Sequence, residues 1–283
     1  MIDSSVAELL KLRRHAATWL LVWIYPICVA LLLSSTLIRE VVLDAAPEKV
    51  SSAADWLGKS RIVWAAPQSA FGRFVMAGFC AMAFAGEYGW NTWKLLIPVR
   101  LRWQLIAAKW IVVTGLLFVS FIAADALVVL GDGLRAALGL KPVPADLGGF
   151  DVLRCHLEGL AQAFLPIIYT VAWAGLLAVT TRSVLATMLL SIAVVWVEQS
   201  LVGITGVLAG YAAMTTKLGV TLLPFYHVGN VVEYFRTGKP LILFVGPGDQ
   251  LTLDWQVSLT VSAGWILGIG AVTLLSFERQ DHN

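Results

Sequence analysis

Four polar residues interrupt apolar stretches that are long enough to cross a membrane: Arg73, Asp125, Glu198 and Gln199. A charge at membrane depth is costly, so such residues mark a path for ions, protons or substrate, or they bond to a neighbouring helix. Arg73 and Asp125 lie in consecutive stretches, each in the half farther from the connection between them, and we expect them to pair. The alternative is that each side chain extends separately to the nearest interface.

Glu198 and Gln199 lie past the middle of their stretch. The carboxylate of Glu198 could face a translocation path or accept a hydrogen bond from an adjacent helix, and the sequence leaves both roles open.

A second group of residues lies in the connection "GEYGWNTWKLLIPVRLRWQLIAAKW", Gly86 to Trp110. Asn91 is placed to cap a short helix and Pro98 to end it. Such a helix, lying parallel to the membrane, would project a rigid knob. At the membrane surface, the cations Arg100, Arg102 and Lys109 would hold the chain at the lipid headgroups. The tryptophans expected to form an aromatic belt beside them are Trp90, Trp93, Trp103 and Trp110. The alternative is an ordinary basic loop with an aromatic girdle.

Motifs for enzymatic chemistry are absent. The sequence contains no HExxH and no GxSxG, and its four histidines are scattered. The segment "RTGKPL" lacks the first glycine of a phosphate-binding loop, so nucleotide binding of that kind is excluded. The three cysteines are isolated, which gives no disulfide framework and no metal spacing. We therefore expect no enzyme activity, cofactor or metal in this chain, and a net charge of +2 suggests no nucleic-acid partner.

The elements that must position these residues are membrane-spanning helices. The chain has 283 residues, of which 59% are hydrophobic and 13% charged, whereas soluble domains carry about 25% charged residues. A spanning helix needs about 20 apolar residues. Six runs satisfy this: 17–38, 68–84, 105–129, 157–179, 184–208 and 256–277. We expect an all-α integral membrane protein with one domain over 1–283.

Residues 1–16 predict an amphipathic helix lying in the headgroup plane, with Ser5 and Glu8 as a capping box. A frayed tail is the alternative. No cleavage site follows the first apolar run, so we expect it to be retained as an anchor. The density of Lys and Arg in the short connections places both termini in the cytoplasm.

Three longer connections are expected outside. Residues 39–67 should contain a helix near 53–57, and residues 131–154 read as a turn-rich loop. Residues 211–254 are too apolar for a free loop and too interrupted to span, which favours a re-entrant or surface-lying pair of short helices.

The stretch after the second run resembles the signature of ABC type-2 exporter permeases. That pattern begins with an acid at the end of the second span and ends with a lysine that opens the third, here Glu87 and Lys109. Between them lie Thr92, a leucine pair and Arg100 or Arg102, with Asn91 where glycine is expected. The start "AELLKLRRHAATWLLVWIYP" and the end "FERQDHN" also resemble the family.

The resemblance implies a permease subunit of an ATP-driven exporter in the cell inner membrane. A second copy or a related permease would complete the membrane core, and a separate ATPase subunit would bind ATP and Mg. The residues coupling to that ATPase would be Glu87, Tyr88, Trp90, Asn91, Thr92, Trp93, Lys94, Arg100 and Arg102. The competing interpretations are a six-span secondary transporter or channel-like protein without an ATPase, and an intramembrane enzyme.

Overall fold

The structure, a computed structural model, describes residues 2–43, 46, 48–89, 93, 101–246 and 249–280. Nearly all of its regular structure is helical. In chain order the elements are α1 (Ile2–Arg14), α2 (Ala16–Leu37), the π-helical segment η1 (Ile38–Val42), α3 (Ala53–Ser60), the 3-10 helix η2 (Ile62–Gln68), α4 (Ala70–Gly89), α6 (Arg102–Ala137), α7 (Gly149–Thr181), α8 (Val184–Leu222), α9 (Pro224–Thr237), β1 (Leu243–Gly246), β2 (Asp249–Leu251) and α10 (Trp255–Glu278).

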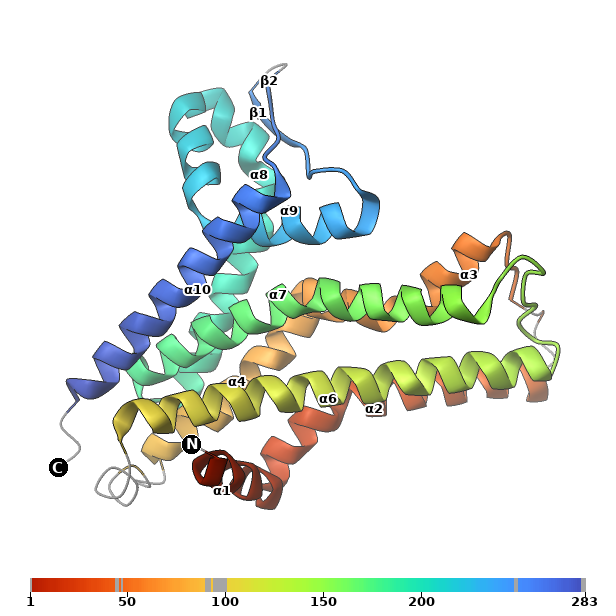
Figure 1. Ribbon diagram of the computed structural model, residues 1–283, viewed down its shortest axis with the longest axis horizontal. Helices are drawn as coiled ribbons and strands as arrows, with labels where there is room; N and C mark the ends of the chain where they lie inside the picture. Colours follow the sequence, from red (N-terminus) through yellow and green to blue (C-terminus); the bar gives the residue numbers. More distant parts are fainter. Residues whose placement is uncertain are drawn as a thin grey trace.

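The helices form two arms that meet at one end (Figure 1). One arm contains α2 packed along α6, with α3 and the first half of α7 beside them; the other contains α8, α9 and α10. The main core lies where α2, α4, α6 and α7 meet and includes the buried rings of Phe79, Phe84 and Phe121. Both termini lie near the joined end of the arms. The strands β1 and β2 form a small antiparallel hairpin, with Leu243 opposite Leu251, at the far end of the second arm.

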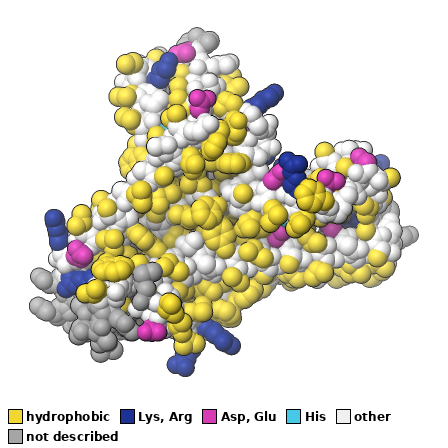
Figure 2. Space-filling model, viewed as in Figure 1, with side chains coloured by type: hydrophobic (Ala, Val, Ile, Leu, Met, Phe, Trp, Pro, Cys, Tyr) yellow, Lys and Arg dark blue, Asp and Glu magenta, His cyan; other side chains and the backbone are white. Residues whose placement is uncertain are grey.

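Within the described ranges, five helices are long and apolar enough to cross a membrane: α2 with η1, α6, α7, the first part of α8, and α10. The predicted run 68–84 falls in α4, which qualifies only together with η2, at a bend of 66°. A second bent pair, 203–222 with α9, meets at 64°, so the described residues contain five to seven candidate spans by length and composition. Figure 2 shows hydrophobic side chains over both arms, as expected for lipid contact.

The bend before α4 depends on a glycine. A Cβ atom at Gly72 would lie 1.9 Å from the carbonyl oxygen of Ala66, so a larger residue would force η2 away from α4. The carbonyl of Gly72 also accepts a hydrogen bond of 2.7 Å from Tyr25 on α2. These contacts fix the direction in which α4 leaves η2, and thereby place Arg73 at the first turn of α4 inside the protein.

The connections are more helical than the sequence indicates. The predicted loop 131–154 is wrong at both ends, because α6 continues to Ala137 and α7 already begins at Gly149. Asp132 and Arg135 make ion pairs that hold the last turns of α6, and Gly139 ends the helix with a φ of +73°. The connection 211–254 contains the end of α8 after a kink at Ala212, then α9 and the hairpin.

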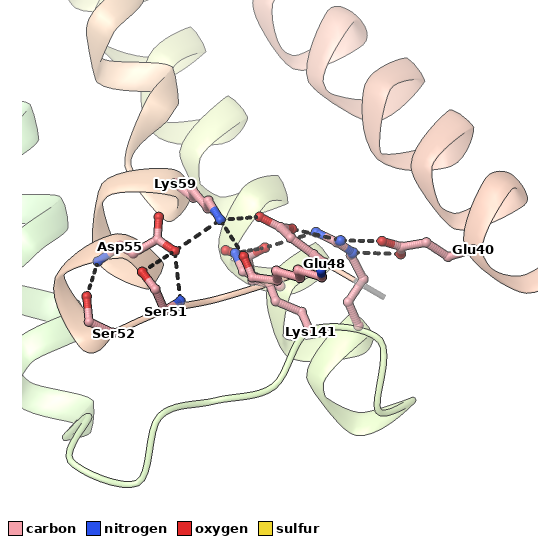
Figure 3. Close-up of polar contacts among 10 residues, drawn as sticks. Glu40, Glu48, Ser51, Ser52, Asp55, Lys59 and Lys141 are labelled. Carbon is pink, nitrogen blue, oxygen red and sulfur yellow. Dashed lines mark hydrogen bonds and ion pairs between the residues drawn. The ribbon is translucent and has the colours of Figure 1, made fainter. Parts of the chain in front are cut away.

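A network of ion pairs holds the connection 48–60 against the far end of α6 (Figure 3). Arg135 binds Glu40 through two hydrogen bonds of 2.9 and 2.5 Å and lies 2.8 Å from Glu48. Glu48 also lies 3.3 Å from Lys59 of α3. The pKa of Glu48 is lowered: partial burial alone would raise it, but its bonds to Arg135 and Lys59 outweigh that effect. Arg135 is only 6% exposed, so this network links η1, α3 and α6 through a buried cation.

We predict that Arg135→Met lowers the Tm of the detergent-solubilised protein by roughly 5–10 °C, because Glu40 then stays buried without its cation. The matched control is Lys217→Met, which breaks an exposed pair with Asp249 at 3.6 Å and should change the Tm by about 1–2 °C or less. A thermal scan that gives both variants equal shifts would contradict this account.

Candidate functional site

A cluster of buried charges lies at the joined end of the arms, where α1, α4 and α6 meet. Lys109 of α6 donates hydrogen bonds to Glu8 of α1 at 2.6 Å, to Glu87 of α4 at 2.8 Å and to the carbonyl oxygen of Ala83 at 2.9 Å. Lys109 is 2% exposed and Glu87 is fully buried. A single ammonium group, whose three donors are all used, therefore joins three helices.

Lys11 completes this cluster of two acids and two bases. Its Nζ lies 2.8 Å from Glu8 and also contacts Glu87. Burial alone would raise the pKa of Glu8, but the charges of Lys109 and Lys11 outweigh burial and hold that pKa below its usual value. Glu8 therefore stays ionised near neutral pH, within a cluster that contains two acids, Glu8 and Glu87, and two bases, Lys11 and Lys109.

The same end of the protein joins both flanks of the connection 90–100 to the end of α10. Arg102 donates to the carbonyl oxygens of Phe277, Glu278 and Gln280 at 3.3, 2.5 and 2.9 Å, which is how a cation stabilises a helix C-terminus. On the other flank, Tyr88 donates to Gln280 at 2.8 Å. Gln280 in turn donates to the carbonyl oxygen of Val179 at the end of α7. Four helix ends thus meet around one short connection.

Trp93 lies inside this junction. It is 2% exposed, its ring centroid lies 4.6 Å from that of Phe277, and Lys109 lies 5.4 Å above its ring. The prediction that Trp93 anchors the chain in the headgroup belt is therefore wrong, as is the prediction that Lys109 reaches the headgroups. Both are buried because the acids Glu8 and Glu87 and the ring of Phe277 supply partners inside the protein.

The structure brings together four of the residues predicted to couple to an ATPase: Glu87, Tyr88, Trp93 and Arg102. Five others, Trp90, Asn91, Thr92, Lys94 and Arg100, lie outside the described residues, as does the predicted short helix apart from Trp93. The role of Glu8 and Lys11 in the junction was missed. Their spacing of three places both on one side of α1, but a sequence does not show which helix that side meets.

We predict that Lys109→Met lowers the Tm of the solubilised protein by roughly 5–10 °C, because two buried carboxylates lose their shared cation. The double variant Lys109→Met with Glu87→Gln should recover part of that loss, because position 87 then no longer carries a buried charge that lacks its cation. Strictly additive Tm losses in this double-mutant cycle would show that the two residues do not interact.

A second polar group lies where α4, α7 and α8 cross. Arg73 of α4, 6% exposed, lies 2.8 Å from Glu198 of α8 and donates through Nε to Thr170 of α7 at 2.9 Å. The hydroxyl of Tyr169, also on α7, donates to the other oxygen of Glu198, and the Arg73 guanidinium lies 5.6 Å from the Tyr169 ring centroid. The first turn of α4 is therefore cross-linked by polar contacts to the inner parts of α7 and α8.

The predicted pair of Arg73 and Asp125 is wrong. Asp125 accepts a hydrogen bond from His156 of α7 at 2.8 Å, and His156 in turn lies 3.4 Å from Ser60 of α3. The two residues have different partners because Arg73 lies on the side of α4 that meets α7 and α8, whereas Asp125 lies on the side of α6 that meets α7 near α3. Membrane depth was a poor guide because it does not fix the direction of a side chain around its helix.

Gln199 donates to the carbonyl oxygen of Gln68 at 3.2 Å and, with Arg73 and Glu198, lines a cavity of about 230 Å³. Glu198 therefore bonds to neighbouring helices and also faces this cavity, while its role in a translocation path stays a prediction. Among the described residues, no cluster of three or more His, Cys, Asp or Glu side chains is placed to hold a metal ion.

We predict a strong energetic coupling between Arg73 and Glu198 and none between Arg73 and Asp125. In a double-mutant cycle, the loss of stability in Arg73→Met with Glu198→Gln should differ from the sum of the two single losses by roughly 1–3 kcal/mol. The losses of Arg73→Met and Asp125→Asn should add to within about 0.5 kcal/mol, because Asp125 pairs with His156 instead. The reverse pattern of coupling would contradict the observed pairing.

A family model described as "ABC-2 family transporter protein" matches residues 6–195, which is more than half of the chain and includes the ion-pair cluster, both flanks of the connection and the Arg73 side of the second polar group. No curated protein and no solved structure matches the chain.

Proposed function

Because the chain belongs to the ABC-2 family of transporter proteins, we propose that it is the membrane-spanning subunit of an ATP-driven exporter. Family membership makes it a multi-pass membrane protein of the ABC permease type. The proposal adds three features: a separate ATPase subunit that binds ATP and Mg, a second permease chain that is identical or related, and transport out of the cell by alternating access.

The connection after α4 is the part we assign to the ATPase contact. Its flanking residues, Glu87 and Arg102, are tied to α1 and to the end of α10. A push on the connection would therefore reach four helix ends at once instead of bending a free loop. This convergence is the observation that carries the proposal, since coupling requires that ATP-driven movement at one site change the equilibrium between two arrangements of the spans.

The remaining features of the proposal concern orientation. The start of α1, the end of α10 and both flanks of the connection lie at the same end of the protein, and we place that end in the cytoplasm of the cell inner membrane. The helix α1 carries its exposed apolar side chains Ile2, Val6 and Leu10 away from the ion-pair cluster, which suits a helix lying at the membrane surface. Arg13 and Arg14 at its end would then meet anionic headgroups.

We predict that the full chain co-purifies with an ATPase subunit encoded by a neighbouring reading frame. Thr92→Pro and Lys94→Glu should each reduce the amount of co-purified ATPase about tenfold, because each alters the contact surface. The control Glu158→Gln changes an exposed ion pair on α7 away from that end and should leave co-purification unchanged.

Two results would contradict the proposal. One is undiminished co-purification and export with both connection variants. The other is transport by the purified chain in vesicles without any ATPase, which would instead favour a secondary transporter.

A further inference from the structure

The cavity beside Arg73 and Glu198 has the features of a ligand site. It lies between α4, α7, α8 and α9 and has a volume of about 230 Å³. Its apolar wall is formed by Pro166, Phe225, Val228, Val232 and Leu241. Arg73, Glu198 and Glu233 supply the charges on its lining, and Gln68 and Gln199 supply amides. An apolar cavity with a few converging polar groups is the usual form of a small-molecule site.

Arg73 keeps unused hydrogen-bond donors in this cavity. A guanidinium has five N–H donors. Arg73 donates through Nε to Thr170, its Nη2 lies 2.8 Å from Glu198 Oε2 in an ion pair, and its Nη1 makes no hydrogen bond to any residue of the described ranges. Because Arg73 lines the cavity, Nη1 is available to donate a hydrogen bond to an oxygen of a ligand held there.

The charges around the cavity balance, and this balance selects the ligand. Arg73 is paired with Glu198, and Glu233 is paired with Arg236 at 2.6 Å. A ligand with a net charge would leave one charge uncompensated beside a buried pair, which is costly away from water. A ligand that carries one charge of each sign adds none, and it can satisfy the free donors of Arg73 at the same time.

We propose that this cavity binds a zwitterionic amphiphile. Its anionic group accepts hydrogen bonds from Nη1 of Arg73, its cationic group lies near the carboxylates of Glu198 and Glu233, and its apolar part packs against the wall formed by α7 and α9. The headgroup could belong to a lipid of the surrounding bilayer or to a free amphiphile, and the chemistry that recognises it is the same. The site needs no ATPase, so its test is independent of the proposed coupling.

The test uses three short amphiphiles that differ only in charge: hexylphosphocholine, hexyl phosphate and hexyltrimethylammonium, each below its micellar concentration. Their binding to the full chain in an uncharged detergent is measured by isothermal titration calorimetry. We expect hexylphosphocholine to bind about tenfold more tightly than either ionic compound, because only it preserves the charge balance. Arg73→Met should weaken its binding about tenfold by removing the donor.

A second variant separates loss of the site from loss of folding. Glu198→Gln keeps the shape of the side chain and an oxygen for Tyr169, but it leaves the cavity with the charge of Arg73 uncompensated. The preference should then reverse, so that hexyl phosphate binds more tightly than hexylphosphocholine. The control Glu158→Gln makes the same chemical change at an exposed pair on α7 and should keep the wild-type order.

Two outcomes would overturn the proposal: no binding of any of the three compounds to the wild-type chain, or the same order of affinities in the wild type and in Glu198→Gln. The source of the ligand is tested in nanodiscs. If a bilayer headgroup fills the site, hexylphosphocholine should bind in phosphatidylglycerol nanodiscs but not in phosphatidylcholine nanodiscs. If the site takes only a free amphiphile, it should bind in both.

Discussion

Buried charges that must find partners away from water determine how the helices of this protein are arranged. In the described part of the chain, the buried side chains of Lys109, Arg73, Arg135 and Lys141 each lie within 3 Å of a carboxylate from another segment or turn. Such pairs add little net stability compared with apolar packing, but removing one partner is costly. Arrangements that would separate the pairs are therefore disfavoured, and this constraint selects one packing among the many that apolar helices in lipid allow.

The pairs occur at three levels along the molecule. Lys109 joins α1, α4 and α6 near the termini, Arg73 joins α4, α7 and α8 near the middle, and Arg135 joins η1, the connection 48–60 and α6 at the far end. The helix α4 takes part in the first two, with Glu87 at its last turn and Arg73 at its first. It therefore connects the proposed ATPase contact directly to the cavity. A shift of α4 along its axis would strain both the Lys109 cluster and the Arg73 group. Movement at the proposed ATPase contact would therefore be felt at the cavity, as coupling between two sites requires.

The balance of charge also shapes what each site can do. At the junction, the cluster of two acids and two bases holds α1 on the protein, although α1 otherwise exposes an apolar face. At the cavity, the neutral pair leaves donors of Arg73 unused and favours a ligand without net charge. At the junction, the carbonyl of Ala83 and the side chain of Lys11 use the remaining donor of Lys109 and acceptor of Glu87, so the cluster only holds the helices together. At the cavity, no protein group uses the remaining donors of Arg73 among the described residues, so they stay available to a ligand.

By itself, the sequence determined the class of the protein. The length of the apolar runs predicts spanning helices, and five of the six predicted runs fall in helices that qualify on their own. The residues from Glu87 to Lys109 carry enough of a pattern to indicate the family, which the match over residues 6–195 shows. These features are local, because hydrophobicity and short motifs act within one turn or one helix.

Only the tertiary structure decided which side chains meet. Arg73 was expected beside Asp125 and instead lies beside Glu198, which is more than a hundred residues away in the sequence. Asp125 pairs with His156. Lys109 was expected at the headgroups and instead lies between Glu8 and Glu87. The sequence gives the depth of a residue along its helix, but the rotation of each helix and the choice of its neighbours come from packing all of them together. Ion pairs between helices depend on that rotation.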